Sequence, residues 1–154
     1  MKIVDFLNEK AISASLKATT KDGIIRELVD LLVKAEGIKN KEELIKVLFN
    51  REALGSTGIG QGIGIPHGKT NVVKELVAAF GICRQGVNFE ALDGEPVYIF
   101  FLLVAPEDSA GPHLKGLARI SRLLKDRFFR ESLKPLTDEK AILKMIRDED
   151  AKKP

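Results

Sequence analysis

Residues 97–104 read VYIFFLLV, an unbroken run of aliphatic and aromatic side chains. A strand with one face in water would alternate apolar with polar residues, so this run predicts a strand that is buried on both faces. Helices then have to cover the sheet above and below. The run is far shorter than the roughly 20 residues that a membrane-spanning helix requires. We therefore expect a layered α/β fold with this strand near the centre of the sheet, and no direct membrane insertion.

The segments that precede this run have extended and helical patterns in turn. Residues 11–16 alternate loosely and predict a first strand. Thr20 is a good N-cap for a helix that ends at Gly37. Asn40 and Glu43 have the spacing of a capping box, which predicts a second helix that leads up to a glycine-rich segment.

The remaining elements are expected from the same signals. Turn residues at 84–86 and 93–94 separate expected strands at 76–83, 87–89 and 97–104. The last third is expected to be helical. Pro112 fits the first position of a helix whose apolar stripe is Leu114, Leu117, Ala118, Ser121 and Leu124. Pro135 ends this region, and a last helix starts at Thr137.

The composition is typical of one globular domain. The chain has 154 residues, of which 44% are hydrophobic and 31% charged. We expect a single domain over 1–154, with residues 148–154 frayed. The formal charge of +3 is too small to indicate a nucleic-acid partner, and the basic residues within 119–130 fit the solvated face of a helix. A single cysteine, Cys83, and the lack of a signal-peptide pattern predict a cytoplasmic location.

A glycine-rich segment contains one of the two histidines of the chain. Residues 56–68 read STGIGQGIGIPHG. Glycine lets backbone amides approach an anion, while hydroxyls either donate to an anion or satisfy a turn. The candidate phosphate-binding residues of the segment are Gly62, Gly64, Ser56 and Thr57. Pro66 fixes the backbone before His67, which predicts a short strand that delivers this imidazole to an exposed corner.

The second histidine follows the expected central strand. His113 falls in the first turn of the next helix, where the positive end of the helix dipole disfavours an imidazolium. Ligands of open α/β sheets gather at the carboxyl ends of the strands. Arg51, at the end of the second helix, either grips an anion or acts as a helix C-terminal cation. If the glycine segment folds onto the same edge, both imidazoles and a set of free amides converge on one site suited to phosphoryl transfer.

Other site chemistries lack their signatures in this chain. Neither a P-loop lysine pattern nor a dinucleotide fingerprint occurs, so no nucleotide cofactor is expected. A hydrolase elbow of the G-x-S-x-G type is also missing. Two histidines with Glu107 and Asp108 nearby are a poor set of zinc ligands, so no metal is expected. Cys83 lies in an expected strand, where it reads as a buried apolar residue.

Residues 51–69, which read REALGSTGIGQGIGIPHGK, resemble the phosphorylation-site motif of an enzyme IIA family of the bacterial phosphotransferase system, the fructose/mannitol and nitrogen-regulatory type. Residues 93–97 and 106–121 are similar to later motifs of that family. The resemblance implies a mixed sheet between helices, a three-layer α/β/α fold. Gly64 departs from the pattern, since many relatives have alanine there.

The resemblance also implies roles for the site residues. His67 would accept phosphate on its distal ring nitrogen from the histidine phosphocarrier protein, and would pass it to a cysteine of a IIB partner. His113 would hydrogen-bond the phosphorylated ring, and Arg51 would neutralise the phosphoryl charge. The chain carries no IIB, phosphocarrier or membrane domain, so the acceptor is expected to be another protein.

Three functions remain open at this point. The first is a phosphoryl carrier of sugar uptake. The second is a regulatory binding module of the nitrogen-regulatory type, whose partners depend on the phosphorylation of His67. The third is an inactive relative that only binds anions. The features of the sequence are shared by the first two branches of the family and leave this choice undecided.

Overall fold

A mixed sheet forms the middle layer of the computed structural model, which describes residues 1–153. Within these residues the sheet has six strands in the order β1-β5-β6-β3-β2, and β4 also pairs with β6. The strands are β1 Leu7–Ser13, β2 Gly58–Gly60, β3 Ile63–Gly64, β4 His67–Lys69, β5 Val77–Val87 and β6 Val97–Ala105. β6 runs antiparallel to β5 and parallel to β3 and β4, so the expected mixed sheet is confirmed.

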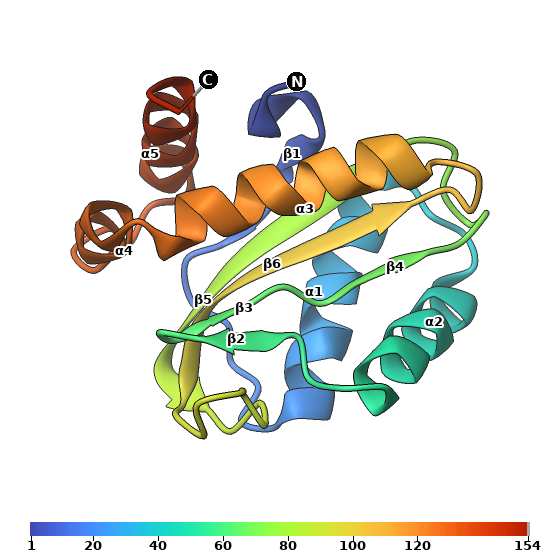
Figure 1. Cartoon of the computed structure of the whole chain (residues 1–154), viewed down its shortest axis with the longest axis horizontal. Coiled ribbons are helices and arrows are strands. Elements are labelled where there is room, and N and C mark those ends of the chain that lie inside the picture. The colour runs from blue at the N-terminus through green and yellow to red at the C-terminus, as the bar shows by residue number, and fades with distance from the viewer. Residues whose placement is uncertain (154) are drawn as a thin grey trace.

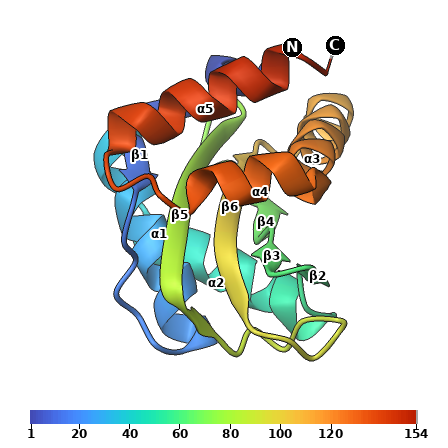
Figure 2. The ribbon, with the colours of Figure 1, turned by 90° about the vertical axis from the view of Figure 1, so that its left-hand side faces the viewer.

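Helices cover both faces of this sheet. They are η1 Ile3–Asp5, α1 Lys21–Glu36, α2 Lys41–Ala53, α3 Ala110–Lys125, α4 Arg127–Leu133 and α5 Glu139–Ala151. α1 and α2 pack on one face, and α3, α4 and α5 on the other (Figures 1 and 2). Phe100 and Leu102 of β6 belong to the first core, Phe101 and Leu103 to the second. β6 is therefore buried on both faces, as its sequence predicted.

The caps of the first two helices are also confirmed. The Thr20 hydroxyl accepts from the Gly23 amide at 3.0 Å, and Gly37 ends α1 in the left-handed conformation at φ 67°. The Asn40 side chain accepts from the Glu43 amide at 3.2 Å at the start of α2. Among residues 1–153, no helix is long and apolar enough to cross a membrane.

Three expectations about the strands are wrong, since residues 87–89 also form no strand of their own. The first strand spans Leu7–Ser13 rather than 11–16. Residues 84–86 form no turn, because β5 continues through them to Val87. The pairing of β5 with β6 changes register between Ile82 and Val87. Gly86 lies within this interval and has a φ of 76°. The irregularity is therefore a bulge in one strand and not a turn between two strands.

The helices of the C-terminal third are present, but the buried face of α3 differs from the predicted one. α3 starts at Ala110, so Pro112 is its third residue, and Leu114 is 67% exposed. The buried stripe is instead His113, Gly116, Ile120, Leu123 and Leu124. This is a rotation by one position, about 100° around the helix axis. α5 is capped by Asp138 rather than Thr137.

The expected fraying of residues 148–154 is wrong for the part that the structure describes. α5 continues to Ala151, and Asp150 is buried at 3% exposure. Its carboxylate accepts from Arg119 Nε at 2.7 Å and from the Ile3 amide at 2.8 Å. These bonds tie the C-terminal helix to α3 and to the N-terminus. Residue 154 lies outside the described residues.

Candidate functional site

His67 is the first residue of β4 and pairs with Leu103 near the carboxyl end of β6. Its side chain is half-buried and shares a sheet face with Ile65, two residues earlier, on the side covered by α3. Its Nδ1 atom lies 2.6 Å from the Ile65 carbonyl oxygen. A carbonyl only accepts hydrogen bonds, so Nδ1 must donate and carry the proton. The neutral ring therefore keeps its lone pair on Nε2.

His113 lies beside this ring, on α3. The two ring centroids are 5.6 Å apart and the rings are tilted by 48°. His113 is 7% exposed, and its Nε2 atom is buried without a hydrogen-bond partner in the described structure. Gly116, one turn later, allows this close approach, since a Cβ there would lie 3.3 Å from Leu103. A buried nitrogen without a partner is unusual in a folded protein, and a group bound beside His67 would supply that partner.

Both imidazoles are held neutral at pH 7. Burial is the main cause that lowers the pKa of His67; the hydrogen bond to Ile65 acts against it, and the charge of Arg51 acts with it. Burial, followed by the nearby His67 and Lys69, lowers the pKa of His113 to about 4. Two neutral imidazoles offer lone pairs and N–H donors without mutual repulsion.

The low pKa of His113 predicts a loss of stability in weak acid. Unfolded histidine takes up its proton near pH 6.5, whereas folded His113 does so only near pH 4, so the unfolded state binds more protons between these values. The free energy of unfolding is therefore at its full value above pH 6.5 and falls as the pH drops toward 4. Urea unfolding at about pH 7.5 and about pH 5 should show an additional loss of about 1–2 kcal/mol in the wild type relative to His113→Gln. Equal losses in both proteins would contradict this pKa.

Arg51 reaches the site from the opposite face of the sheet. It lies in the last turn of α2, one turn after Val47, and the packing of Val47 against Gly68 brings α2 close to β4. Arg51 Nη1 donates to the Gly55 carbonyl at 2.8 Å. Its positive charge also contributes to the lowered pKa of His67. The structure thus brings His113 beside His67, and the packing of α2 against Gly68 brings the end of α2, with Arg51, close to β4.

Gly68 is expected to tolerate no larger residue, because a Cβ there would lie 2.9 Å from Val47 Cγ1. Gly68→Ala should lower the free energy of unfolding by about 1–3 kcal/mol, since α2 has to move away from β4. Thermal or urea unfolding measures this change.

The neighbouring substitutions provide the controls. Gly68→Ala combined with Val47→Ala should recover part of the loss, because the clashing methyl group is gone. Gly111→Ala, with nothing within 4 Å of its Cβ, should cost no stability. If Gly68→Ala and Gly111→Ala are equally stable, α2 is not held by this contact.

The glycine segment does not converge on His67 as expected. β2 and β3 form a hairpin, and Gln61 and Gly62 make its turn with φ values of 59° and 79°. The Gly62 carbonyl accepts from the amides of Tyr98 and Ile99 at 2.8 and 3.1 Å, at the start of β6. Ile99 and Leu103 are four positions apart, about 13 Å along the strand.

Gly64 is likewise removed from the histidines. It lies in β3, between β2 and β6, where it pairs with Phe100. The sheet pairing therefore does not bring Gly62 and Gly64 next to the histidines, and phosphate contact by their amides stays a prediction. The absence of a side chain at Gly64 serves packing, since a Cβ there would lie 3.2 Å from the Phe100 ring.

The two hydroxyls of the segment also serve the fold. Ser56 Oγ donates to the Phe89 carbonyl at 2.8 Å and accepts from the Gly58 amide at 3.0 Å. Thr57 is buried, and its hydroxyl donates to the Glu52 carboxylate. Both hydroxyl protons are thus donated within the protein. These bonds fit the role of satisfying local backbone and side-chain groups better than the role of contacting phosphate.

Sequence reasoning missed two charged residues of the site. Glu52 follows Arg51 directly and lies near enough to His67 to act on its pKa. Lys69 follows His67 by two residues, so its side chain leaves β4 on the same face, and its charge acts on His113. The two-residue period of a strand could have indicated that Lys69 lies on the same face as His67. The burial of Glu52 had no signal in the sequence.

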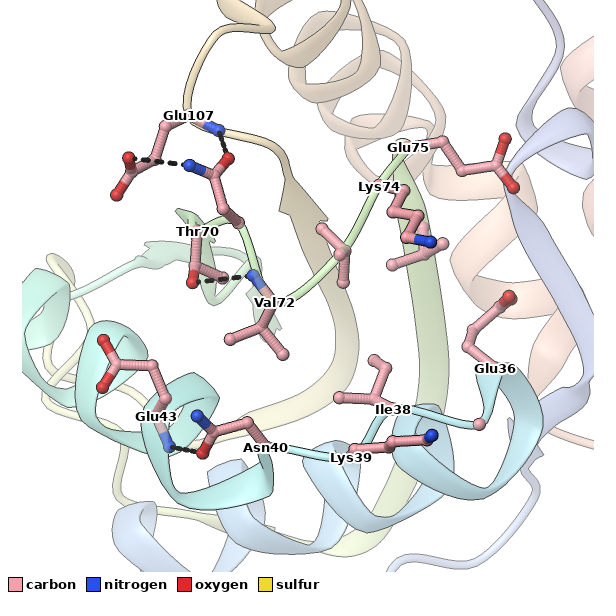
Figure 3. A pocket seen from close by; sticks show the side chains of 14 residues that line it. Glu36, Ile38, Lys39, Asn40, Glu43, Thr70, Val72, Lys74, Glu75 and Glu107 are labelled. Atoms are coloured by element: carbon pink, nitrogen blue, oxygen red, sulfur yellow. Dashed lines mark hydrogen bonds between the residues drawn. The ribbon is translucent and has the colours of Figure 1, made fainter.

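A cleft of about 860 Å³ lies between the α1–α2 connection and the segment that follows β4 (Figure 3). Its rim carries charges of both signs, including Glu43, Lys74 and Glu107. Neither histidine lines it. Asn71 and Glu107 exchange two hydrogen bonds of 3.1 Å across its edge, which join the end of β4 to the segment before α3. The histidine site is therefore separate from this cleft.

The fold and the histidine pair define an α/β domain of the enzyme IIA class. Residues 5–149 match the family model described as Phosphoenolpyruvate-dependent sugar phosphotransferase system, EIIA 2, and the chain belongs to this family.

Individual relatives come from both branches of the family. The crystal structure of the nitrogen regulatory protein IIA-Ntr from Neisseria meningitidis has a TM-score of 0.85 and 32% identity, over 94% of this chain and 98% of that one. The fructose-specific EIIABC component of Bacillus subtilis is 37% identical over 97% of this chain, which spans 24% of that protein's length. A complex of enzyme IIA mannitol with phosphorylated enzyme IIB mannitol from Escherichia coli shares the fold at a TM-score of 0.76 and 24% identity, over 89% of this chain and 94% of that one.

Proposed function

We propose that this chain is a phosphoryl carrier that accepts phosphate on Nε2 of His67 from a histidine phosphocarrier protein. The observation that carries the proposal is the 2.6 Å hydrogen bond from His67 Nδ1 to the Ile65 carbonyl, because it leaves the lone pair on Nε2. The low pKa of His67 keeps this lone pair available at neutral pH. Membership of the family supports the same role.

The transfer then needs few groups. The Nε2 lone pair of His67 attacks phosphorus while the bond from phosphorus to the donor's histidine breaks, and the Nδ1 proton stays on the ring. The buried Nε2 of His113 donates a hydrogen bond to a phosphoryl oxygen, and the charge of Arg51 offsets the negative charge. In the second step a IIB cysteine thiolate attacks phosphorus, and the lone pair returns to His67. That a IIB domain is the acceptor is supported by the solved complex of a protein with the same fold.

A regulatory role is the second candidate, and the similarity to IIA-Ntr favours it. In this role the chain accepts the same phosphate, and the charge on His67 selects its protein partners. Pull-downs with His67→Ala and with the mimic His67→Asp separate the roles. Capture of a protein other than a IIB domain by only one variant supports regulation, whereas capture of a IIB domain supports transport.

Phosphoryl labelling tests the shared part of both proposals. The chain is incubated with enzyme I, the phosphocarrier protein and phosphoenolpyruvate. A phosphate that is labile in acid and stable in alkali, at one per chain, is expected on His67. If the phosphocarrier protein is labelled and this chain is not, both proposals fail, and the remaining function is that of an inactive relative that only binds anions.

A further inference from the structure

Glu52 is a buried carboxylate to which the proposed chemistry gives no task. It directly follows Arg51 in the last turn of α2, and its side chain is 6% exposed. A buried carboxylate is costly unless its oxygens have partners. Oε1 accepts from the Thr57 amide at 3.1 Å and lies 3.0 Å from Lys21 Nζ, and Oε2 accepts from the Thr57 hydroxyl. Both oxygens are therefore engaged.

The two bonds to Thr57 close the loop of residues 54–57 onto the end of α2. Inside this loop, Gly55 has a φ of 148°, and its amide donates to the Glu52 carbonyl at 3.1 Å. The Gly55 carbonyl accepts from Arg51 Nη1 at 2.8 Å. The closed loop thus contains the acceptor that holds the guanidinium in place.

The loop is also anchored to two other segments. Lys21, the first residue of α1, pairs with Glu52 and lies 4.9 Å above the Phe89 ring. Ser56 Oγ donates to the carbonyl of the same Phe89 at 2.8 Å. A shift of the loop would break these contacts together, so the Gly55 carbonyl has a defined position.

Two independent features fix the position of Arg51 at the end of α2. The contact of Val47 with Gly68 sets the distance between α2 and β4, and hence the backbone of Arg51. The closed loop orients its side chain. Gly68 directly follows His67 in β4, so this contact places the end of α2 near that ring, and the effect of the Arg51 charge on the pKa of His67 agrees with this placement.

We propose that Glu52 is a positioning residue of the site: by closing the loop through Thr57, it holds the Arg51 guanidinium beside His67. The consequence for phosphoryl transfer rests on the proposed function, but the placement of Arg51 does not. The proposal can therefore be tested in the unphosphorylated chain.

The test is an NMR titration of the His67 ring in the full chain. Arg51→Ala is expected to raise the pKa of His67, because a nearby positive charge is removed. Thr57→Val is isosteric, opens the loop and should raise the pKa in the same direction. Adding Thr57→Val to Arg51→Ala should change nothing further, since the second substitution acts only through Arg51.

Two control variants have matched positions. Thr57→Ser keeps the hydroxyl and should retain the wild-type pKa of His67. Glu90 is the other carboxylate near Lys21; its side chain is 75% exposed, and its Oε1 atom lies 3.4 Å from Lys21 Nζ. Glu90→Gln should therefore also leave the pKa of His67 unchanged. A wild-type pKa in Thr57→Val, or a further rise when it is added to Arg51→Ala, would overturn the proposal.

A second pair of variants covers the case in which Thr57→Val does not fold. Glu52→Gln should lower the pKa of His67 in the Arg51→Ala background, where only its own negative charge is lost. In the wild-type background, Glu52→Gln should also release Arg51, which raises the pKa of His67 and so reduces the net decrease. Identical shifts in both backgrounds would show that Glu52 does not act through Arg51.

The titration uses no phosphoryl donor, so it gives a result even if the chain accepts no phosphate. If phosphoryl transfer does occur, Thr57→Val should slow the phosphorylation of His67 on the order of tenfold, and Thr57→Ser should not. A normal rate in Thr57→Val would show that the position of Arg51 has no catalytic consequence.

Discussion

Replacement of His67 by alanine is expected to abolish phosphorylation of the chain, with a loss of about a thousandfold or more in the rate of labelling. The phosphorus has to bond to a nitrogen with a free lone pair, and Nε2 of His67 has one because Nδ1 donates to Ile65. His113 is not expected to take over this task, because it is 7% exposed and less open to a protein donor than the half-buried His67. Labelling from phosphoenolpyruvate, through enzyme I and the phosphocarrier protein, measures the loss.

The fold of this variant can be checked independently. His67 is half-buried at the start of β4, so truncation to alanine should leave the cooperative unfolding transition intact. A folded His67→Ala protein that still takes up acid-labile phosphate would refute His67 as the acceptor. His113→Gln is the matched control and should remain labelled.

Replacement of His113 by alanine is expected to leave His67 able to accept phosphate but to slow onward transfer by about a hundredfold. His113 Nε2 is buried, has no hydrogen-bond partner in the described structure, and belongs to a ring 5.6 Å from that of His67. A donor in this position stabilises the phosphoryl oxygens most when their charge is redistributed, which is in the transition state. Rapid mixing of the phosphorylated variant with a competent IIB domain measures the rate.

A rescue variant separates hydrogen bonding from packing. His113→Gln retains an N–H donor and should lose less of the rate than His113→Ala. Wild-type transfer by His113→Ala would exclude a role for His113. Equal losses in both variants would show that the shape of the imidazole matters, rather than its donor.

Prediction from sequence succeeded where a few neighbouring residues carry the whole signal. α1 begins after a hydroxyl cap at Thr20 and ends at a left-handed Gly37, and both features depend on contacts within one helical turn. The apolar run at residues 97–104 predicted β6 and its burial for the same reason. The resemblance to the enzyme IIA family, which the family model confirms, came from a continuous motif at 51–69.

Prediction failed where packing between distant segments sets the outcome. The stripe of α3 is one position away from the expected one because Gly116 packs against Leu103 and turns His113 inward, which leaves Leu114 exposed. The expected turn at 84–86 is a bulge, because both sides of it continue to pair with β6. Neither contact partner is near in sequence, so local patterns carried no information about them.

Local sequence patterns were enough to place His67 in a short extended segment and His113 after the end of the buried β6 strand. Only the tertiary structure set which groups surround them. Parallel pairing spreads the glycine segment along β6, with Gly62 at the start of the strand and His67 near its end, while α2, which carries Arg51 and Glu52, packs against β4. The physical reason is that caps and strand patterns act over a few residues, whereas these neighbours depend on sheet register and on the close contacts that Gly68 and Gly116 permit.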